Sequence, residues 1–286
     1  MAKNKSEAIR KAYIDFGDSY KCKYAKNQIA EEKGFSGVKV SCEGPRMHFL
    51  TESIHPNIAS PKRPRVMLLF SNPHPDSVAQ GLFMSEKRSR GFWKILSSIS
   101  QLGINHDFCW NDHDITESVS LLLNGRYGNY RSPLLFFDCL YQIPSNSPKD
   151  LKKLFKPKTR DFDCYLHRPS LERIGTILDC YNIKTVLVFT IETFESITDK
   201  PRIPKDSREI LCSLVKEELR TGNRESFWRQ MDNNKLKRQV VLPNLNHDCI
   251  AIKVMDTFVK YRWKNGDRYI FSWVLEYALE YAAEAT

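Results

Sequence analysis

RVMLLFSNP (residues 65–73) is an unbroken apolar run that ends in a polar turn. Five successive apolar residues, 66–70, are typical of a strand that is covered on both faces, as strands of a parallel sheet are. Pro64 precedes the run and Asn72-Pro73 follows it, and such residues favour a break in regular structure. The segment therefore predicts a central strand of a parallel sheet, and this prediction decides the fold class.

Three further apolar runs have the same character, at 134–137 (LLFF), 185–190 (TVLVFT) and 239–243 (QVVLP). Helical patterns occur at 91–102, 171–181, 207–220 and 250–263. Strands that alternate with helices indicate a parallel sheet, because parallel neighbours need crossover connections and these are usually helical. The expected fold class is α/β, a three-layer α/β/α sandwich with a central four-stranded parallel sheet. The polar stretches 103–131 and 199–238 predict loops or small insertions.

Residues 1–60 differ from the rest of the chain. They combine a short helical pattern at 7–16 with many lysines and a turn-rich stretch that leads to Pro61 and Pro64. We expect a basic N-terminal extension over 1–60 and one folded domain over 61–286.

The composition limits the possible partners. The chain has 286 residues, and 44 Lys and Arg against 34 Asp and Glu give a net charge of +10, which favours nucleic acid although an ordinary basic enzyme is not excluded. Eight cysteines without a C-x-x-C pair indicate reduced thiols and argue against structural zinc. The polar N-terminus and the absence of a long apolar run predict a cytoplasmic protein that does not bind membranes.

The predicted sheet directs attention to the loops that follow its strands. Ligands of open parallel sheets bind beyond the carboxyl ends of the strands. The candidate segments are therefore 71–83, 138–148 and 244–249, which follow the first, second and fourth predicted strands.

These loops resemble motifs of the uracil-DNA glycosylase superfamily. SNPHPDSVAQGLF (71–83), followed by GFWKIL (91–96), resembles the first motif of its mismatch-specific branch, and VLPNLNHD (241–248) resembles the second. FFDCLYQIP (136–144) and the segment 164–190 resemble elements of the iron-sulfur branch. The likeness covers roughly residues 65–265 through short, moderately specific motifs.

The resemblance implies a monofunctional DNA glycosylase, with residues 61–286 as its catalytic domain. Such an enzyme flips a nucleotide out of double-stranded DNA, cleaves the bond between base and sugar with water, and leaves an abasic site. Asn72 falls where the family orients the attacking water, unless Asn72-Pro73 is only a turn. Asn244 falls where the family donates to the departing base. His247 is either a donor to the base or a phosphate, or a helix cap together with Asp248.

Further positions concern recognition of the flipped base. Phe83 or Met84 falls where relatives stack an aromatic ring on the base, although Phe83 is equally interpretable as core. His74 replaces the residue that closes the pocket at the C5 position of a pyrimidine. Asp76 and Asn246 are the remaining candidates for substrate contact in the two loops.

Asp138 falls where relatives carry an asparagine that pairs with uracil. An ionised carboxylate only accepts hydrogen bonds, so Asp138 favours the amino group of a cytosine, unless it is a structural residue bonded to backbone amides. His74 also replaces the residue that closes the pocket at C5. The two replacements together predict a C5-modified cytosine as substrate, such as glucosylated hydroxymethylcytosine in phage DNA, and a role in antiviral defence.

The remaining expectations concern DNA, cofactors and alternatives. Phosphate contacts are expected from Ser77 and from the basic run Lys87, Arg88 and Arg90, for which a solvated loop is the ordinary explanation. We expect a monomer with no cofactor and no metal, because only Cys164 matches a cysteine of the iron-sulfur branch. Two alternatives stay open: a uracil or thymine mismatch glycosylase, and a DNA-binding module of the same fold without catalysis.

Overall fold

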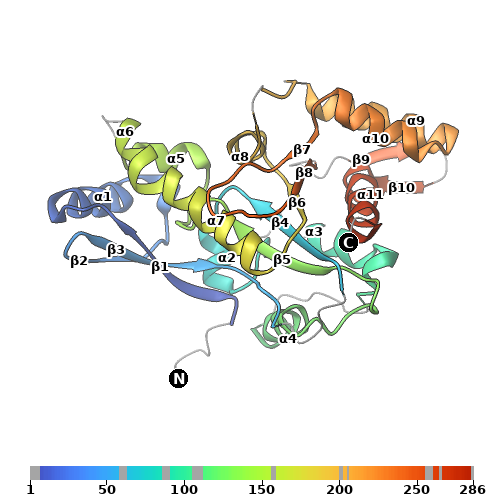
Figure 1. Ribbon diagram of the computed structural model, residues 1–286. Coiled ribbons are helices and arrows are strands. Elements are labelled where there is room, and N and C mark those ends of the chain that lie inside the picture. The colour runs from blue at the N-terminus through green and yellow to red at the C-terminus, as the bar shows by residue number, and fades with distance from the viewer. Residues whose placement is uncertain are drawn as a thin grey trace.

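The computed structural model describes residues 7–57, 63–85, 91–104, 112–155, 159–199, 202–204, 206–254, 260–263 and 266–284. Its centre is a five-stranded sheet in the order β5-β4-β6-β8-β7 (Figure 1). The strands are β4 (Arg65–Phe70), β5 (Leu134–Cys139), β6 (Thr185–Val188), β7 (Lys237–Gln239) and β8 (Ile250–Lys253). The first three parallel strands and the α/β class are confirmed, but the sheet has five strands and not four.

The fourth parallel strand lies elsewhere than predicted. β7 ends at Gln239 and runs antiparallel to β8, whereas β8 continues the parallel set beside β6. The expected helix over 250–263 is therefore wrong, because 250–253 and 260–263 are both strands. The apolar run 250–254 is too short for periodicity to separate strand from helix. The loop 240–249 connects the end of an antiparallel strand to the beginning of a parallel one, so it lies at the amino edge of the parallel strands.

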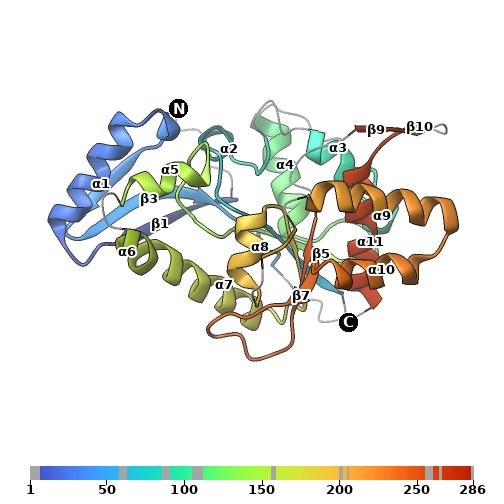
Figure 2. The ribbon, with the colours of Figure 1, turned by 90° about the horizontal axis from the view of Figure 1, so that it is seen from above.

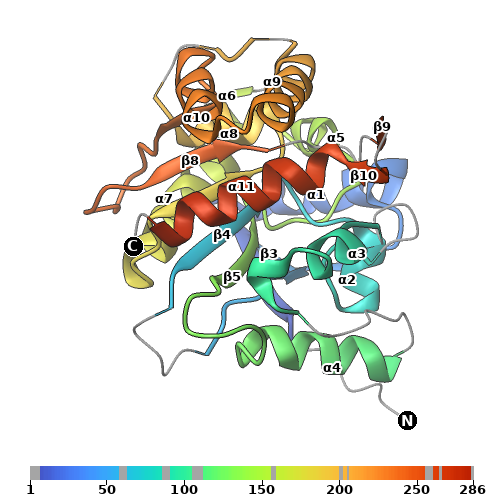
Figure 3. The same ribbon diagram turned by 90° about the vertical axis from the view of Figure 1, so that its right-hand side faces the viewer.

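Helices cover both faces of this sheet (Figure 3). The connection from β4 to β5 contains α2 (Pro75–Gln80), α3 (Gly91–Ser97), the 3-10 turn η2 (Ser100–Leu102) and α4 (Asp112–Leu123). The connection from β5 to β6 contains α5 (Pro148–Lys153), α6 (Thr159–Phe162), the π-helical turn η3 (Asp163–His167) and α7 (Arg168–Cys180). α7 lies on one side of the sheet and α3 and α4 lie on the other, which gives the three expected layers.

The C-terminal half of the chain adds further helices. α8 (Ile191–Ile197), α9 (Ser207–Thr221) and α10 (Arg224–Asn233) lie between β6 and β7. The hairpin β9 (Lys260–Trp263) and β10 (Gly266–Tyr269) leads into α11 (Ile270–Glu284), which contacts β4, η2 and α9. α4 and α10 lie in stretches that were expected to be loops. In α4 the buried residues Ile115, Val119 and Leu122 recur at helical spacing, a signal that the polar composition of 103–131 obscures.

The N-terminal segment, which was predicted to be a basic extension, contains regular strands and helices (Figure 2). It contains β1 (Ile9–Asp15), α1 (Ser19–Glu31), η1 (Lys33–Phe35), β2 (Val40–Glu43) and β3 (Arg46–Glu52), with an antiparallel sheet in the order β1-β3-β2. The helix expected over 7–16 is wrong, because buried Ala12 and Ile14 alternate with exposed Tyr13 and Asp15, as in a strand. Ile54 and Phe137 exchange two backbone hydrogen bonds of 2.9 Å, which join this unit to β5.

Gly175 allows α7 to approach the loop 240–249 closely. A Cβ atom added to Gly175 would lie 1.8 Å from the carbonyl oxygen of Pro243, so backbone would have to move. We expect Gly175→Ala to lower the free energy of unfolding by about 1–3 kcal/mol through overpacking, although alanine is the better helix former. Urea denaturation measures the change. The control is Glu172→Ala at an exposed position of the same helix. An equal stability of both variants would contradict the close approach.

Candidate active site at the carboxyl edge of the sheet

The strand order defines one switch point at the carboxyl edge. From β4 the chain moves to β5 on one side, and it later returns to β6 on the other side of β4. The point where the strand order reverses, between β4 and β6, is the place where open α/β sheets bind ligands. The rings of Phe70 and Phe189 stack there with a centroid distance of 4.4 Å, and the loop that begins at Ser71 leaves β4 at this point.

Asn72 is held firmly in this loop. Its amide nitrogen donates to the carbonyl oxygen of Ser145 at 2.7 Å, to the hydroxyl of Ser145 at 3.0 Å and to the carbonyl oxygen of Pro73 at 3.2 Å. Its amide oxygen accepts a hydrogen bond from the hydroxyl of Ser71 at 3.0 Å. The donors are thus used inside the protein, whereas the oxygen retains a lone pair for one further donor. Asn72 can therefore orient a water molecule, but it cannot donate to a substrate.

The following turn is organised by helix α2. His74 is the N-cap, and its Nδ1 accepts from the backbone N–H of Asp76 at 3.2 Å. Gly81 ends the helix in the left-handed region at φ 90°, which favours glycine. The His74 ring is half-buried and Asp76 is exposed, so both remain near the loop surface. Ser77 is 1% exposed, so the expectation that it contacts a phosphate is wrong.

Phe83 belongs to the core. It is 2% exposed, and its ring lies 5.6 Å from that of Phe70 and 6.0 Å from that of Phe137. Its carbonyl oxygen also accepts a hydrogen bond from the indole of Trp93 at 2.6 Å. The expectation that Phe83 stacks on a flipped base is therefore wrong, and the alternative of a core residue holds. Met84, which follows it, is half-buried with φ 53°. Lys87, Arg88 and Arg90 lie outside the described residues.

Asp138 is a structural residue. The carboxylate is 1% exposed and accepts from Nη1 of Arg173 at 3.0 and 2.9 Å, from Nε2 of His55 at 2.8 Å and from the backbone N–H of Cys139 at 2.7 Å. Burial by itself would raise the pKa of this carboxyl, but Arg173 and His55 bring the pKa below its usual value. The ionised group joins α7 to the end of β5, and its burial and its hydrogen bonds leave it inaccessible to a substrate. The prediction that Asp138 reads a cytosine is wrong.

The second motif is tied to the opposite edge of the sheet. Nε2 of His247 lies 3.0 Å from the carbonyl oxygen of Ile183, in the turn between α7 and β6. The backbone N–H of Asn246 donates to the carboxylate of Asp179 at 2.9 Å, and the amide of Asn244 donates to the hydroxyl of Thr176 at 3.3 Å. Asp179 and Thr176 both lie on α7.

The two motifs therefore do not form one site. Asn72 follows the carboxyl end of β4, whereas Asn244 and His247 precede the amino end of β8. The expected pairing of Asn72 with Asn244 depended on a fourth parallel strand at 239–243, and this strand is absent from the described part of the chain. The helix-cap alternative for His247 is also wrong, because the next element is the strand β8.

Lys253 is a residue of this edge that the sequence analysis missed. It ends β8, is 2% exposed and donates through Nζ to the carbonyl oxygens of Phe189, at 2.8 Å, and Val254. A single lysine inside the apolar run 250–254 was the available signal, but the run had been assigned to a helix. The ammonium group connects the carboxyl ends of β6 and β8.

Glu52 is a buried acid near the same edge. Its carboxyl is 2% exposed, and Oε2 has no hydrogen-bond partner among the described residues. Burial raises its pKa well above the usual value of 4.5, so the folded protein holds this proton more tightly than the unfolded chain. The acid therefore costs stability as the pH rises from the unfolded pKa toward the folded pKa.

We expect Glu52→Gln to remove this cost. The parent protein should lose up to about 1.4 kcal/mol of stability per pH unit in that window, relative to the variant. Urea denaturation of both proteins between about pH 4 and pH 7 measures the difference. Glu43→Gln is the control, because the side chain of Glu43 is 89% exposed. Parallel pH profiles of the parent and Glu52→Gln would contradict the titration of a buried acid.

The comparisons with known proteins assign no relatives. No protein-family model matches the chain, and no curated protein matches it. Among the described residues there is no group of three or more His, Cys, Asp or Glu side chains that could hold a metal ion. Within the same part of the chain, every helix is too short or too polar to span a membrane.

Proposed function

We propose that the protein is a DNA glycosylase, a hydrolase that cleaves the bond between a base and its deoxyribose and acts as a monomer on double-stranded DNA. The observation that carries the proposal is the position of Asn72 at the switch point between β4 and β6. Ser145 fixes the amide, and the free lone pair on its oxygen is available to a water molecule.

In this reaction the water oxygen forms a bond to C1′ of the sugar while the base leaves with the bonding electron pair. Asn72 accepts one hydrogen bond from the water and so fixes its direction of attack. An amide does not remove the water proton, which passes to solvent after the bond has formed. A slow, water-dependent reaction is the expected result, because positioning contributes without general base catalysis.

The charge of the chain suits a DNA substrate. The net charge of +10 attracts a polyanion and increases the rate of encounter at low salt. The preference for a C5-modified cytosine loses its main support, because Asp138 is occupied by Arg173 and His55. Uracil and mismatched thymine are therefore substrates of equal standing with modified cytosines.

A DNA-binding module without catalysis is the second candidate. The separation of Asn244 and His247 from Asn72 favours it, because the base anion then receives no donor from the second motif. Such a module would bind the same duplexes without releasing a base.

The test is abasic-site formation on a panel of duplexes. The full chain is incubated in excess with duplexes that carry uracil, mismatched thymine, cytosine, hydroxymethylcytosine or its glucosylated form, and alkali reveals abasic sites. We expect strand cleavage with at least one duplex. Binding of duplexes without cleavage of any would replace the glycosylase by the binding module. A protein that neither binds nor cleaves them would overturn both.

A further inference from the structure

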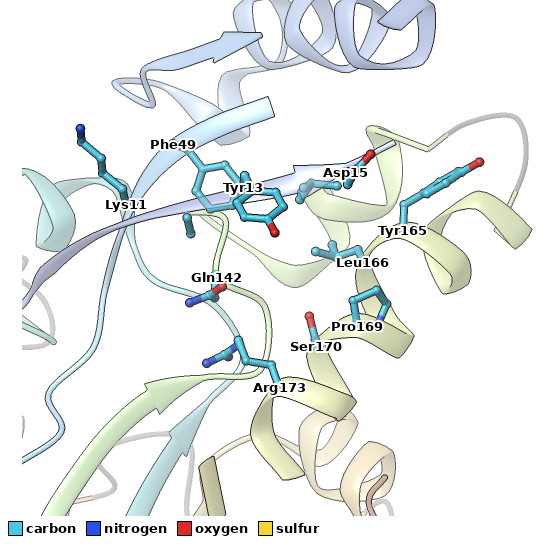
Figure 4. A pocket seen from close by; sticks show the side chains of 12 residues that line it. Lys11, Tyr13, Asp15, Phe49, Gln142, Tyr165, Leu166, Pro169, Ser170 and Arg173 are labelled. Atoms are coloured by element: carbon cyan, nitrogen blue, oxygen red, sulfur yellow. The ribbon is translucent and has the colours of Figure 1, made fainter. Parts of the chain in front are cut away.

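A cavity of about 460 Å³ lies between strand β1 and the helical segment η3–α7 (Figure 4). The residues that line it come from β1, from β3, from the loop after β5 and from one face of η3 and α7. Asn72, His74 and Asp138 are not among them, so the cavity is separate from the candidate active site. Its volume is in the range of pockets that hold small organic molecules.

The cavity faces the edge of β1. All five consecutive residues 11–15 contribute to its lining. Side chains alternate between the two faces of a strand, so one face could supply only every second residue. β1 is the outer strand of its sheet, with β3 on its other side. The backbone N–H and C=O groups that β3 does not use are therefore presented to the cavity.

Polar side chains add to these backbone groups. Ser170 is 6% exposed, and its hydroxyl points into the cavity from α7, while Gln142 lies at the wall opposite β1 (Figure 4). Neither side chain is hydrogen-bonded to another part of the described chain. Nε of Arg173, another lining residue, is itself buried and has no hydrogen-bond partner among the described residues. The hydroxyl of Ser170 and the amide of Gln142 are thus left for a ligand.

Apolar side chains cover much of the remaining wall, and the charges of Arg173 and Asp15 are each matched. Phe49, Leu166 and Pro169 supply flat or aliphatic surface. The charge of Arg173 is balanced by Asp138, and at the rim Asp15 pairs with Arg46, which is not a lining residue, at 3.1 Å. An uncharged ligand is therefore favoured over an anion inside the cavity, since no unpaired charge lies deep in it.

A flat ring with donors and acceptors along its edge would pack against the apolar wall and form hydrogen bonds with the polar groups. The amide of Gln142 and the strand edge each offer both a donor and an acceptor, the pairing that nucleobase edges use. The exposed Lys11 at the rim suits a phosphate attached to such a base, whereas the nearby Lys21 is paired with Asp161 at 3.4 Å. Among small planar ligands, a nucleobase with its sugar fits both the neutral interior and the lysine at the rim.

We propose that the cavity between β1 and α7 binds one nucleobase, with Gln142 and Ser170 bonded to the base edge. The base belongs either to a free nucleoside or to an unpaired position of a nucleic acid strand, and the chemistry of recognition is the same. The proposal does not depend on hydrolysis at Asn72, because the two places share no lining residue.

Calorimetric titration of the full chain with thymidine, deoxycytidine, deoxyadenosine and deoxyguanosine tests this proposal. We expect at least one nucleoside to bind, and Gln142→Ala and Ser170→Ala each to weaken binding about tenfold, the effect of one lost hydrogen bond. Asn146→Ala is the matched control, an amide truncation in the same loop outside the cavity, and should bind within about twofold of the parent. Thermal unfolding checks that the variants are folded.

A second arm identifies the source of the base. If the bound nucleoside is displaced by a single-stranded oligothymidylate, the base comes from a nucleic acid strand. If the nucleoside binds equally with the oligonucleotide present, the ligand is a free nucleoside. The proposal is overturned if no nucleoside and no oligonucleotide binds, or if both Gln142→Ala and Ser170→Ala bind like the parent. Loss of base release in an Asn72 variant with unchanged nucleoside binding would show that the two sites act separately.

Discussion

Asn72→Ala is expected to slow base release by roughly a hundredfold or more, the scale of losing a group that positions a reactant. The amide oxygen of Asn72 retains a lone pair for the water, whereas its amide nitrogen already donates to Ser145 and Pro73. Alanine leaves the attacking water without a fixed partner. Single-turnover rates with excess protein, on the duplex that is cleaved fastest, measure the effect without a contribution from product release.

Asn244→Ala is the matched control for this experiment. It makes the same truncation at the amino edge of the sheet, where the amide of Asn244 donates a hydrogen bond to Thr176. We expect its rate to stay within about twofold of the parent. Ser145→Ala removes one of the clamping contacts and should give an intermediate rate, because the amide oxygen is less firmly held. A parent-like rate in Asn72→Ala would remove Asn72 from the reaction, and an equal loss in Asn244→Ala would contradict the separation of the two loops.

Arg173→Met is expected to lower the free energy of unfolding by about 3–5 kcal/mol, the usual cost of breaking a buried ion pair by removing one partner. Asp138 is 1% exposed, so its carboxylate would lose its main counter-charge in a place that water does not reach. Arg173 also donates to the carbonyl oxygens of Cys139 and Leu140, and these bonds would be lost too. Urea denaturation of the full chain measures the loss.

Arg168→Met provides the control on the same helix. Arg168 pairs with Asp163 at 3.2 Å, but the two side chains are 65% and 49% exposed. An exposed pair of this kind contributes less than about 1 kcal/mol, so the variant should be nearly as stable as the parent. The double variant Arg173→Met with Asp138→Asn should recover part of the lost stability, since no unpaired charge remains. Equal stability of Arg173→Met and Arg168→Met would show that the Asp138 pair is not a structural element.

Three of the four predicted parallel strands are confirmed, and the fourth shows what a local pattern cannot predict. The runs at 66–70, 134–137 and 185–190 are long enough, and rich enough in β-branched and aromatic residues, to predict β4, β5 and β6. The run at 239–243 is equally apolar, yet only its start is in a strand and that strand is antiparallel. Apolar content measures burial and carries no information on strand direction, which depends on the partner that a strand meets.

The sequence by itself determined the α/β class, three of the four parallel strands and the position of Asn72 beyond the end of β4, because each of these follows from hydrophobic runs and turns within a few residues. Only the tertiary structure decided that Asn244 lies at the opposite edge of the sheet, that Arg173 and His55 are hydrogen-bonded to the carboxylate of Asp138, and that β1 and α7 line a cavity. These features join segments far apart in the chain. They are stabilised by ion pairing, burial and strand pairing between distant partners, and the periodicity of a single segment contains no information on those partners.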